Sequence, residues 1–100
     1  MKPVKITKRK HEPNRLGDMA EHYAITWLWD KGYHVFKNCG CTGPADIVAV
    51  SPKGETLLID VKSYKDGRLS AKTTDQRRLG VQYVHYNSET RKCRFVNHRK

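Results

Sequence analysis

The stretch T-L-L-I-D-V at residues 56–61, followed directly by Lys62, decides how the rest of the chain is interpreted. Three apolar side chains alternate along one side of it, and Leu58 makes the other side apolar as well. A strand that is apolar on both faces belongs in the middle of a covered sheet. We therefore expect residues 56–61 to form a central strand.

Charged residues interrupt this strand and the apolar stretch before it. Asp60 and Lys62 end the strand, and Asp46 lies within A-D-I-V-A-V at residues 45–50. Side chains two residues apart on a strand share a face, and Asp46 joins that face if the two strands pair. Because an unpaired buried carboxylate is costly, the group needs a partner. Either Asp60 and Lys62 form an ordinary ion pair at a strand end, or the carboxylates hold Mg²⁺, which prefers oxygen ligands. A bound Mg²⁺ would lower the pKa of its water, and the lysine would orient that water or stabilise charge on phosphate.

A helix is predicted before these strands, over residues 16–31. Gly32 stands where a C-terminal glycine stop belongs. On a helical wheel Glu21 falls at the border of the apolar face. Its carboxylate can therefore point to the edge of the sheet and bind the same Mg²⁺ directly or through water. The apolar residues with helical spacing are Leu16, Ala20, Tyr23, Ala24, Trp27 and Leu28.

The remaining segments complete an α-β-β-β-α-β-β order. Thr73-x-x-Gln76 fits a capping box that starts a short second helix, and Gly80 would close it. We expect strands at residues 33–37, 45–50, 56–61, 81–86 and 92–97, a turn at 40–44, a polar loop at 63–72 and a hairpin turn at 87–90. The chain is thus predicted to be a basic arm at residues 1–15 and one domain at 16–100.

Composition and charge indicate the class of partner. The 100 residues carry a formal net charge of +10, of which residues 1–16 hold +5 and residues 88–100 hold +4. Two basic ends attract a polyanion, so nucleic acid is the favoured partner, although solubilising tails are the simpler explanation. Neither an apolar run of about 20 residues nor a secretory signal is present, which argues against a membrane. Three cysteines at irregular spacing favour a reducing, cytoplasmic setting.

Further side chains are candidates for weaker roles. Trp29 and Ile25 fall on the helical face opposite Trp27, which suggests a second interface, such as that of a homodimer. The three cysteines with His98 lack the usual zinc-ligand spacing, so free thiols are preferred. The candidate nucleic-acid contacts are Lys8, Arg9, Lys10, Arg15, Ser63, Lys65, Arg68, Lys72, Gln76, Arg77 and Arg78, with a capping role as the alternative for Gln76.

Four short motifs carry a family resemblance. The runs G-D-M-A-E at 17–21, G-Y-x-V at 32–35, P-A-D at 44–46 and D-V-K at 60–62 resemble the PD-(D/E)XK nuclease superfamily, above all its small Holliday-junction-resolvase-like and homing-endonuclease-like members. The resemblance implies an α/β (α+β) restriction-endonuclease-like core, α-β-β-β-α-β, with a mixed central sheet flanked by helices. It also implies that Glu21, Asp46 and Asp60 bind the metal and that Lys62 assists attack.

The function implied by this resemblance is a Mg²⁺-dependent DNA endonuclease that hydrolyses phosphodiester bonds, with Mn²⁺ as the expected substitute. No small-molecule cofactor is expected. A short chain leaves little room for a recognition domain, which favours structure-selective cutting. The alternatives are a site-specific homing or restriction-type endonuclease, an RNA-processing nuclease on the same fold, and a non-catalytic basic nucleic-acid-binding module.

Overall fold

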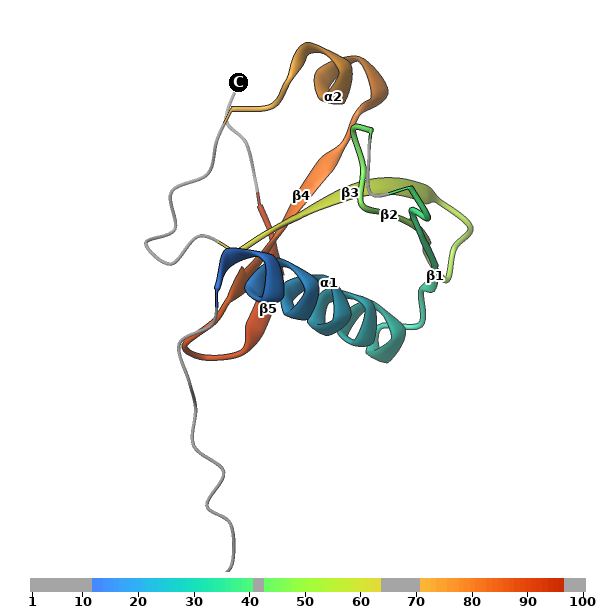
Figure 1. Cartoon of the computed structure of the whole chain (residues 1–100). Helices are drawn as coiled ribbons and strands as arrows, with labels where there is room; N and C mark the ends of the chain where they lie inside the picture. The colour runs from blue at the N-terminus through green and yellow to red at the C-terminus, as the bar shows by residue number, and fades with distance from the viewer. Residues whose placement is uncertain (1–11, 41–42, 64–70, 97–100) are drawn as a thin grey trace, which may run out of the picture.

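A five-stranded mixed sheet crossed on one face by a long helix forms the body of the molecule (Figure 1). The structure is a computed structural model that describes residues 12–40, 43–63 and 71–96. Its elements are α1 (Pro13–Asp30), β1 (His34–Lys37), β2 (Ile47–Val50), β3 (Thr56–Lys62), α2 (Thr74–Leu79), β4 (Gln82–Asn87) and β5 (Lys92–Phe95). The predicted element order is confirmed.

The strands lie in the order β1-β2-β3-β4-β5, so β3 is central, as its two apolar faces predict. All neighbours pair antiparallel except β3 and β4, which are parallel because α2 lies in the connection between them. This mixed sheet with its helices matches the restriction-endonuclease-like core expected from the sequence.

The core lies between α1 and the sheet. Ala24 and Leu28 of α1 pack on Ile47, Ile59 and Val84, and all five are at most 1% exposed. Successive side chains on a strand point to opposite faces of the sheet. The residues of β2 and β3 that alternate with these core residues therefore lie on the other face, which we call the second face. The apolar stripe of α1 therefore covers one face of the sheet only.

Helix α1 begins at Pro13, three residues before the predicted start, because proline fits the first turn of a helix. The predicted arm at residues 1–15 is therefore wrong in its last residues, which are helical, and residues 1–11 lie outside the described residues. Gly32 has φ +85° just after the helix, as a glycine stop requires. In the described ranges, neither helix is long and apolar enough to cross a membrane.

The predicted pairing of Ile25 with Trp29 on an outer face is wrong for Ile25. Ile25 packs against the core, since α1 buries a broader stripe than the strict spacing suggested. Trp29 is 60% exposed, as predicted. A second interface on this helix therefore rests on Trp29 alone.

Helix α2 is short and capped as predicted. Thr73 and Gln76 form the capping box, and Gly80 closes the helix in the left-handed conformation with φ +69°. With six residues, α2 is too short to cover the second face. Phe36 of β1 and Leu79 of α2 therefore remain 61% and 40% exposed.

Candidate active site

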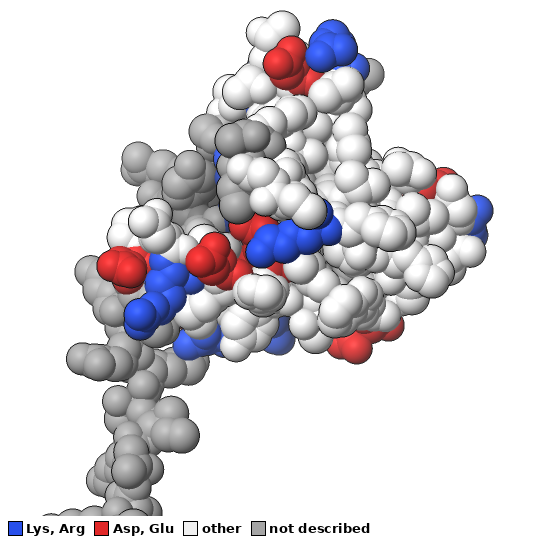
Figure 2. Space-filling view, turned by 45° about the vertical axis from the view of Figure 1, so that its right-hand side comes forward, with Lys and Arg blue, Asp and Glu red and all other residues white. Residues whose placement is uncertain are grey.

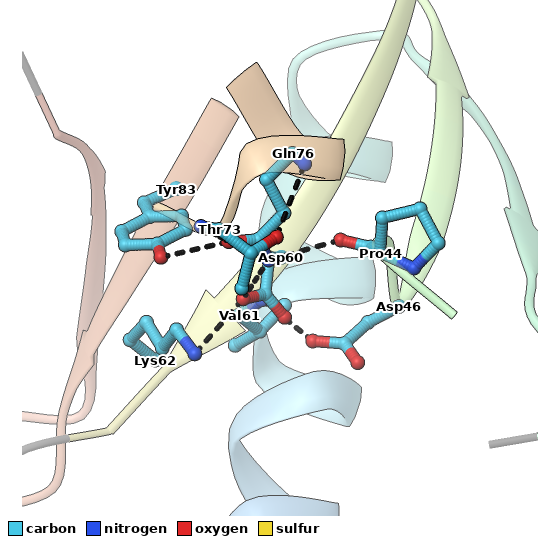
Figure 3. A network of polar contacts seen from close by, with 8 residues as sticks. All are labelled: Pro44, Asp46, Asp60, Val61, Lys62, Thr73, Gln76 and Tyr83. Carbon is cyan, nitrogen blue, oxygen red and sulfur yellow. Dashed lines mark hydrogen bonds and ion pairs between the residues drawn. The ribbon is translucent and has the colours of Figure 1, made fainter. Parts of the chain in front are cut away.

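Asp60 and Lys62 lie side by side at the end of the central strand (Figure 3). Because they are two residues apart on β3, both point to the second face, and Lys62 Nζ lies 2.9 Å from Asp60 Oδ2. Asp60 is 9% exposed. The predicted convergence of this pair is confirmed.

Asp46 lies opposite Asp60, just before β2. Its backbone N–H donates to the Ile59 carbonyl, so pairing continues past the end of the strand. Its Oδ2 accepts a hydrogen bond of 2.7 Å from the Val61 N–H. Strand β2 was predicted to include Asp46 but begins at Ile47. The expected meeting of Asp46 with Asp60 and Lys62 still occurs.

Burial and a side-chain hydrogen bond to Asp60 raise the pKa of Asp46 from 3.8 to about 7, although the Val61 N–H lowers it. Burial and the neighbouring Asp60 carboxyl thus disfavour the charged form of Asp46. A cation bound beside Asp46 would favour its charged form again.

Gln76 connects the site to three other segments. Its Nε2 donates to Asp60 Oδ2 and to the Pro44 carbonyl, each at 3.0 Å. Its Oε1 accepts from the Thr73 N–H at 3.0 Å and from the Tyr83 hydroxyl at 3.1 Å. Both ends of the amide are thus fixed, and the side chain cannot flip without losing bonds. The predicted capping role is confirmed.

Two lysines bring positive charge close to the Tyr83 ring beside Asp60. Lys62 Nζ and Lys72 Nζ lie 5.1 and 5.8 Å from the centre of the Tyr83 ring, within cation–π distance. Tyr83 was not predicted from the sequence as part of the site. The parallel register of β3 and β4 places it beside Asp60, and no local sequence pattern reveals that register.

Glu21 stands at the edge of this group rather than inside it. Its carboxylate lies 4.0 Å from Lys37 Nζ on β1, and its charge contributes to the raised pKa of Asp46. Over the described ranges, no three His, Cys, Asp or Glu side chains come close enough to form a ready metal site. The structure therefore joins Asp46, Asp60 and Lys62 and leaves Glu21 nearby.

The donor chemistry of these residues nevertheless fits a divalent cation. Asp46 and Asp60 lie opposite each other where β2 and β3 pair, and hard cations such as Mg²⁺ take carboxylate oxygens and keep several waters. Two protein carboxylates are enough for Mg²⁺ when phosphate and water complete its shell.

The other predicted contacts are spread around the site. Arg15 is exposed at the start of α1, Ser63 follows β3, and Arg77 and Arg78 are exposed on α2. Figure 2 shows charged side chains gathered near the middle and at the margins of one face, beside a wide area without charge. Predicted contacts Lys8, Arg9, Lys10, Lys65 and Arg68 lie outside the described residues, as do Cys41 and His98.

The two described cysteines are free thiols, as preferred from the sequence. Cys39 is exposed, and burial raises the pKa of Cys93 to about 11. A thiol with so high a pKa is unreactive near neutral pH.

Fold and site together define a restriction-endonuclease-like core with PD-(D/E)XK-type residues at the ends of two neighbouring strands. Several solved structures resemble it, among them two nucleases. A bacterial homing endonuclease has a TM-score of 0.63 and 25% identity, over 87% of this chain and 66% of that chain. A Holliday junction resolvase from Archaeoglobus fulgidus, an archaeal hyperthermophile, has a TM-score of 0.52 and 24% identity, over 79% of this chain and 80% of that chain.

The likeness to the homing endonuclease confirms the family resemblance drawn from the sequence. The likeness to the resolvase shows the fold alone. The chain spans 66% of the length of the homing endonuclease. No protein-family model and no curated protein matches the chain.

Proposed function

We propose that this chain is a metal-dependent DNA endonuclease that hydrolyses phosphodiester bonds. The observation that carries the proposal is the meeting of Asp46, Asp60 and Lys62 on the second face, where the Asp46 carboxyl lies against the Val61 N–H beside Asp60. An ordinary ion pair at a strand end would not need the second carboxyl group. The likeness to a bacterial homing endonuclease supports the same conclusion.

Asp46 and Asp60 would hold Mg²⁺, with Mn²⁺ as a substitute, and Glu21 would contribute directly or through water. When bound, the cation would polarise a phosphate oxygen and make hydroxide available at neutral pH. Lys62, kept in place by Asp60, would orient the attacking water or stabilise charge that develops on the phosphate. Gln76 would hold Asp60 in its position through the 3.0 Å hydrogen bond.

We propose DNA as the substrate because the chain has a net charge of +10 and is similar to a homing endonuclease. Exposed arginines on α2 and Lys72 near the site would contact phosphates and draw affinity from counterion release. Cutting both strands with one site per chain favours a symmetric homodimer.

The proposal is tested with a panel of labelled substrates: supercoiled plasmid, a four-way junction, a flap, linear duplex and an RNA hairpin. We expect DNA to be cut with Mg²⁺, no cutting with EDTA, and loss of activity in Asp60→Ala. Asp30→Asn, an exposed carboxylate at the end of α1, is the matched control and retains activity. Binding without cutting would indicate a non-catalytic module, and cutting of RNA alone an RNA-processing enzyme.

A further inference from the structure

An apolar hollow of about 380 Å³ opens on the second face between α2 and the sheet. Seven of its lining residues are apolar and come from β1, the turn before β2, the sheet centre and α2. They are Phe36, Pro44, Ala45, Ile47, Val48, Leu58 and Leu79. Phe36 and Leu79, at 61% and 40% exposure, are large apolar side chains left open to solvent there.

The hollow and the candidate active site are built from the same segments. Leu58 precedes Asp60 by two residues on the same face of β3, a separation of about 7 Å. Ala45 is the neighbour of Asp46, and the Pro44 carbonyl accepts the Gln76 amide that also binds Asp60. A phosphate at the carboxylates would therefore bring its adjoining nucleotide to the edge of the hollow.

We propose that the hollow receives an unpaired nucleobase next to the scissile phosphate, and that it thereby selects DNA with unpaired bases. This inference rests on the proposed function. A base in a duplex is stacked on both sides and cannot enter, whereas a base at a branch point, flap or single strand can stack on an aromatic ring such as Phe36. The hollow would thus serve as the determinant of structure selectivity.

Charge favours a nucleic-acid strand over a second copy of the chain as the occupant. Lys37, the one charged residue in the lining, has its Nζ 4.0 Å from Glu21 of α1, on the other face of the sheet. The hollow is therefore lined by apolar side chains, which suit the face of a base. A second copy carries a net charge of +10 and would be repelled by the first, whereas a nucleic-acid strand would be attracted.

The test uses branched DNA with 2-aminopurine at the unpaired position and a fully paired duplex with the same label. In EDTA, we expect wild-type protein to change the fluorescence of the branched probe only. Phe36→Ala should bind the branched probe about 5- to 150-fold more weakly, the range for loss of one base–aromatic stack, and bind duplex as before. In Mg²⁺, the variant should raise KM on branched DNA and leave kcat unchanged.

Three controls keep the result interpretable. His22→Ala, which removes an exposed ring on α1, should behave as wild type. Phe36→Tyr, which keeps the ring, should restore binding. A thermal melt by circular dichroism should show that Phe36→Ala folds, as expected for a side chain that is 61% exposed.

The inference is overturned if Phe36→Ala weakens both probes equally, or if the fluorescence of the branched probe does not depend on Phe36. It is also overturned if Phe36→Ala only dissociates a dimer in sedimentation, because a second copy then occupies the hollow. Failure of the proposed function looks different. In that case wild-type protein cuts nothing, while the Phe36-dependent fluorescence change persists.

Discussion

Replacing Gln76 by alanine removes the side chain that joins α2, β3, β4 and the turn at Pro44. The side chain is 7% exposed and makes four hydrogen bonds, to Thr73, Pro44, Asp60 and Tyr83. Alanine would leave the buried Tyr83 hydroxyl and Asp60 without these partners. An unsatisfied buried polar group costs about 1–3 kcal/mol, and a lost capping interaction about 1 kcal/mol.

We therefore expect Gln76→Ala to lower the free energy of unfolding by about 2–4 kcal/mol. For a domain of this size, each kcal/mol corresponds to about 4–8 °C in Tm. The measurement is urea unfolding followed by circular dichroism, with Gln82→Ala as the matched control, because Gln82 is an exposed glutamine on β4. The control should change stability by less than about 0.5 kcal/mol.

Gln76→Glu separates the hydrogen bonds from the shape of the side chain. A protonated glutamic acid can still donate to Asp60, but an ionised one repels it. This variant should be nearly as stable as wild type at pH 5 and much less stable at pH 8. The reasoning is refuted if Gln76→Ala loses less than about 1 kcal/mol, or if Gln76→Glu shows the pH dependence of wild type.

Three further predictions concern stability. The Asp46 pKa is raised from 3.8 to about 7 in the folded protein, so the stability from its bound proton is fully present below pH 3.8 and lost as pH rises through 7. Metal-free protein should thus lose stability between about pH 4 and 7 in urea titrations, and Mg²⁺ or Asp46→Asn should flatten this slope. Leu28→Ala, at 0% exposure, should cost about 2–5 kcal/mol by the same titration, whereas Trp29→Ala should cost less than about 0.5. Tyr83→Phe removes one hydroxyl donor to Gln76 and should cost about 1 kcal/mol by thermal melt, and a loss above 3 would contradict this network.

Much of the fold was predictable because its local signals agree with one another. The apolar spacing of α1, the glycine stop at Gly32 and the capping box at Thr73 each depend on a few neighbouring residues. The two apolar faces of residues 56–61 correctly predicted a central strand. Helix and strand ends were less predictable, since Pro13 extends α1 and pairing persists at Asp46 beyond the regular strand.

The site was predictable only where its residues lie on paired, adjacent strands. Asp60 and Lys62 follow from strand alternation, and Asp46 from a short hairpin connection. The contacts of Gln76 with Asp60 and Tyr83 depend on where α2 returns to the sheet, which is tertiary information. The apolar hollow beside Phe36 has the same origin, because it results from the shortness of α2.

The most direct test of the central claim is the rate of plasmid cleavage as a function of Mg²⁺ concentration, for wild type and Lys62→Ala. Lys53→Ala, an exposed lysine in the turn between β2 and β3, is the matched control. The account predicts Mg²⁺-dependent cleavage that falls by about 10²–10³ in Lys62→Ala and is unchanged in the control. Cleavage that persists in EDTA, or that Lys62→Ala performs as fast as wild type, would contradict it.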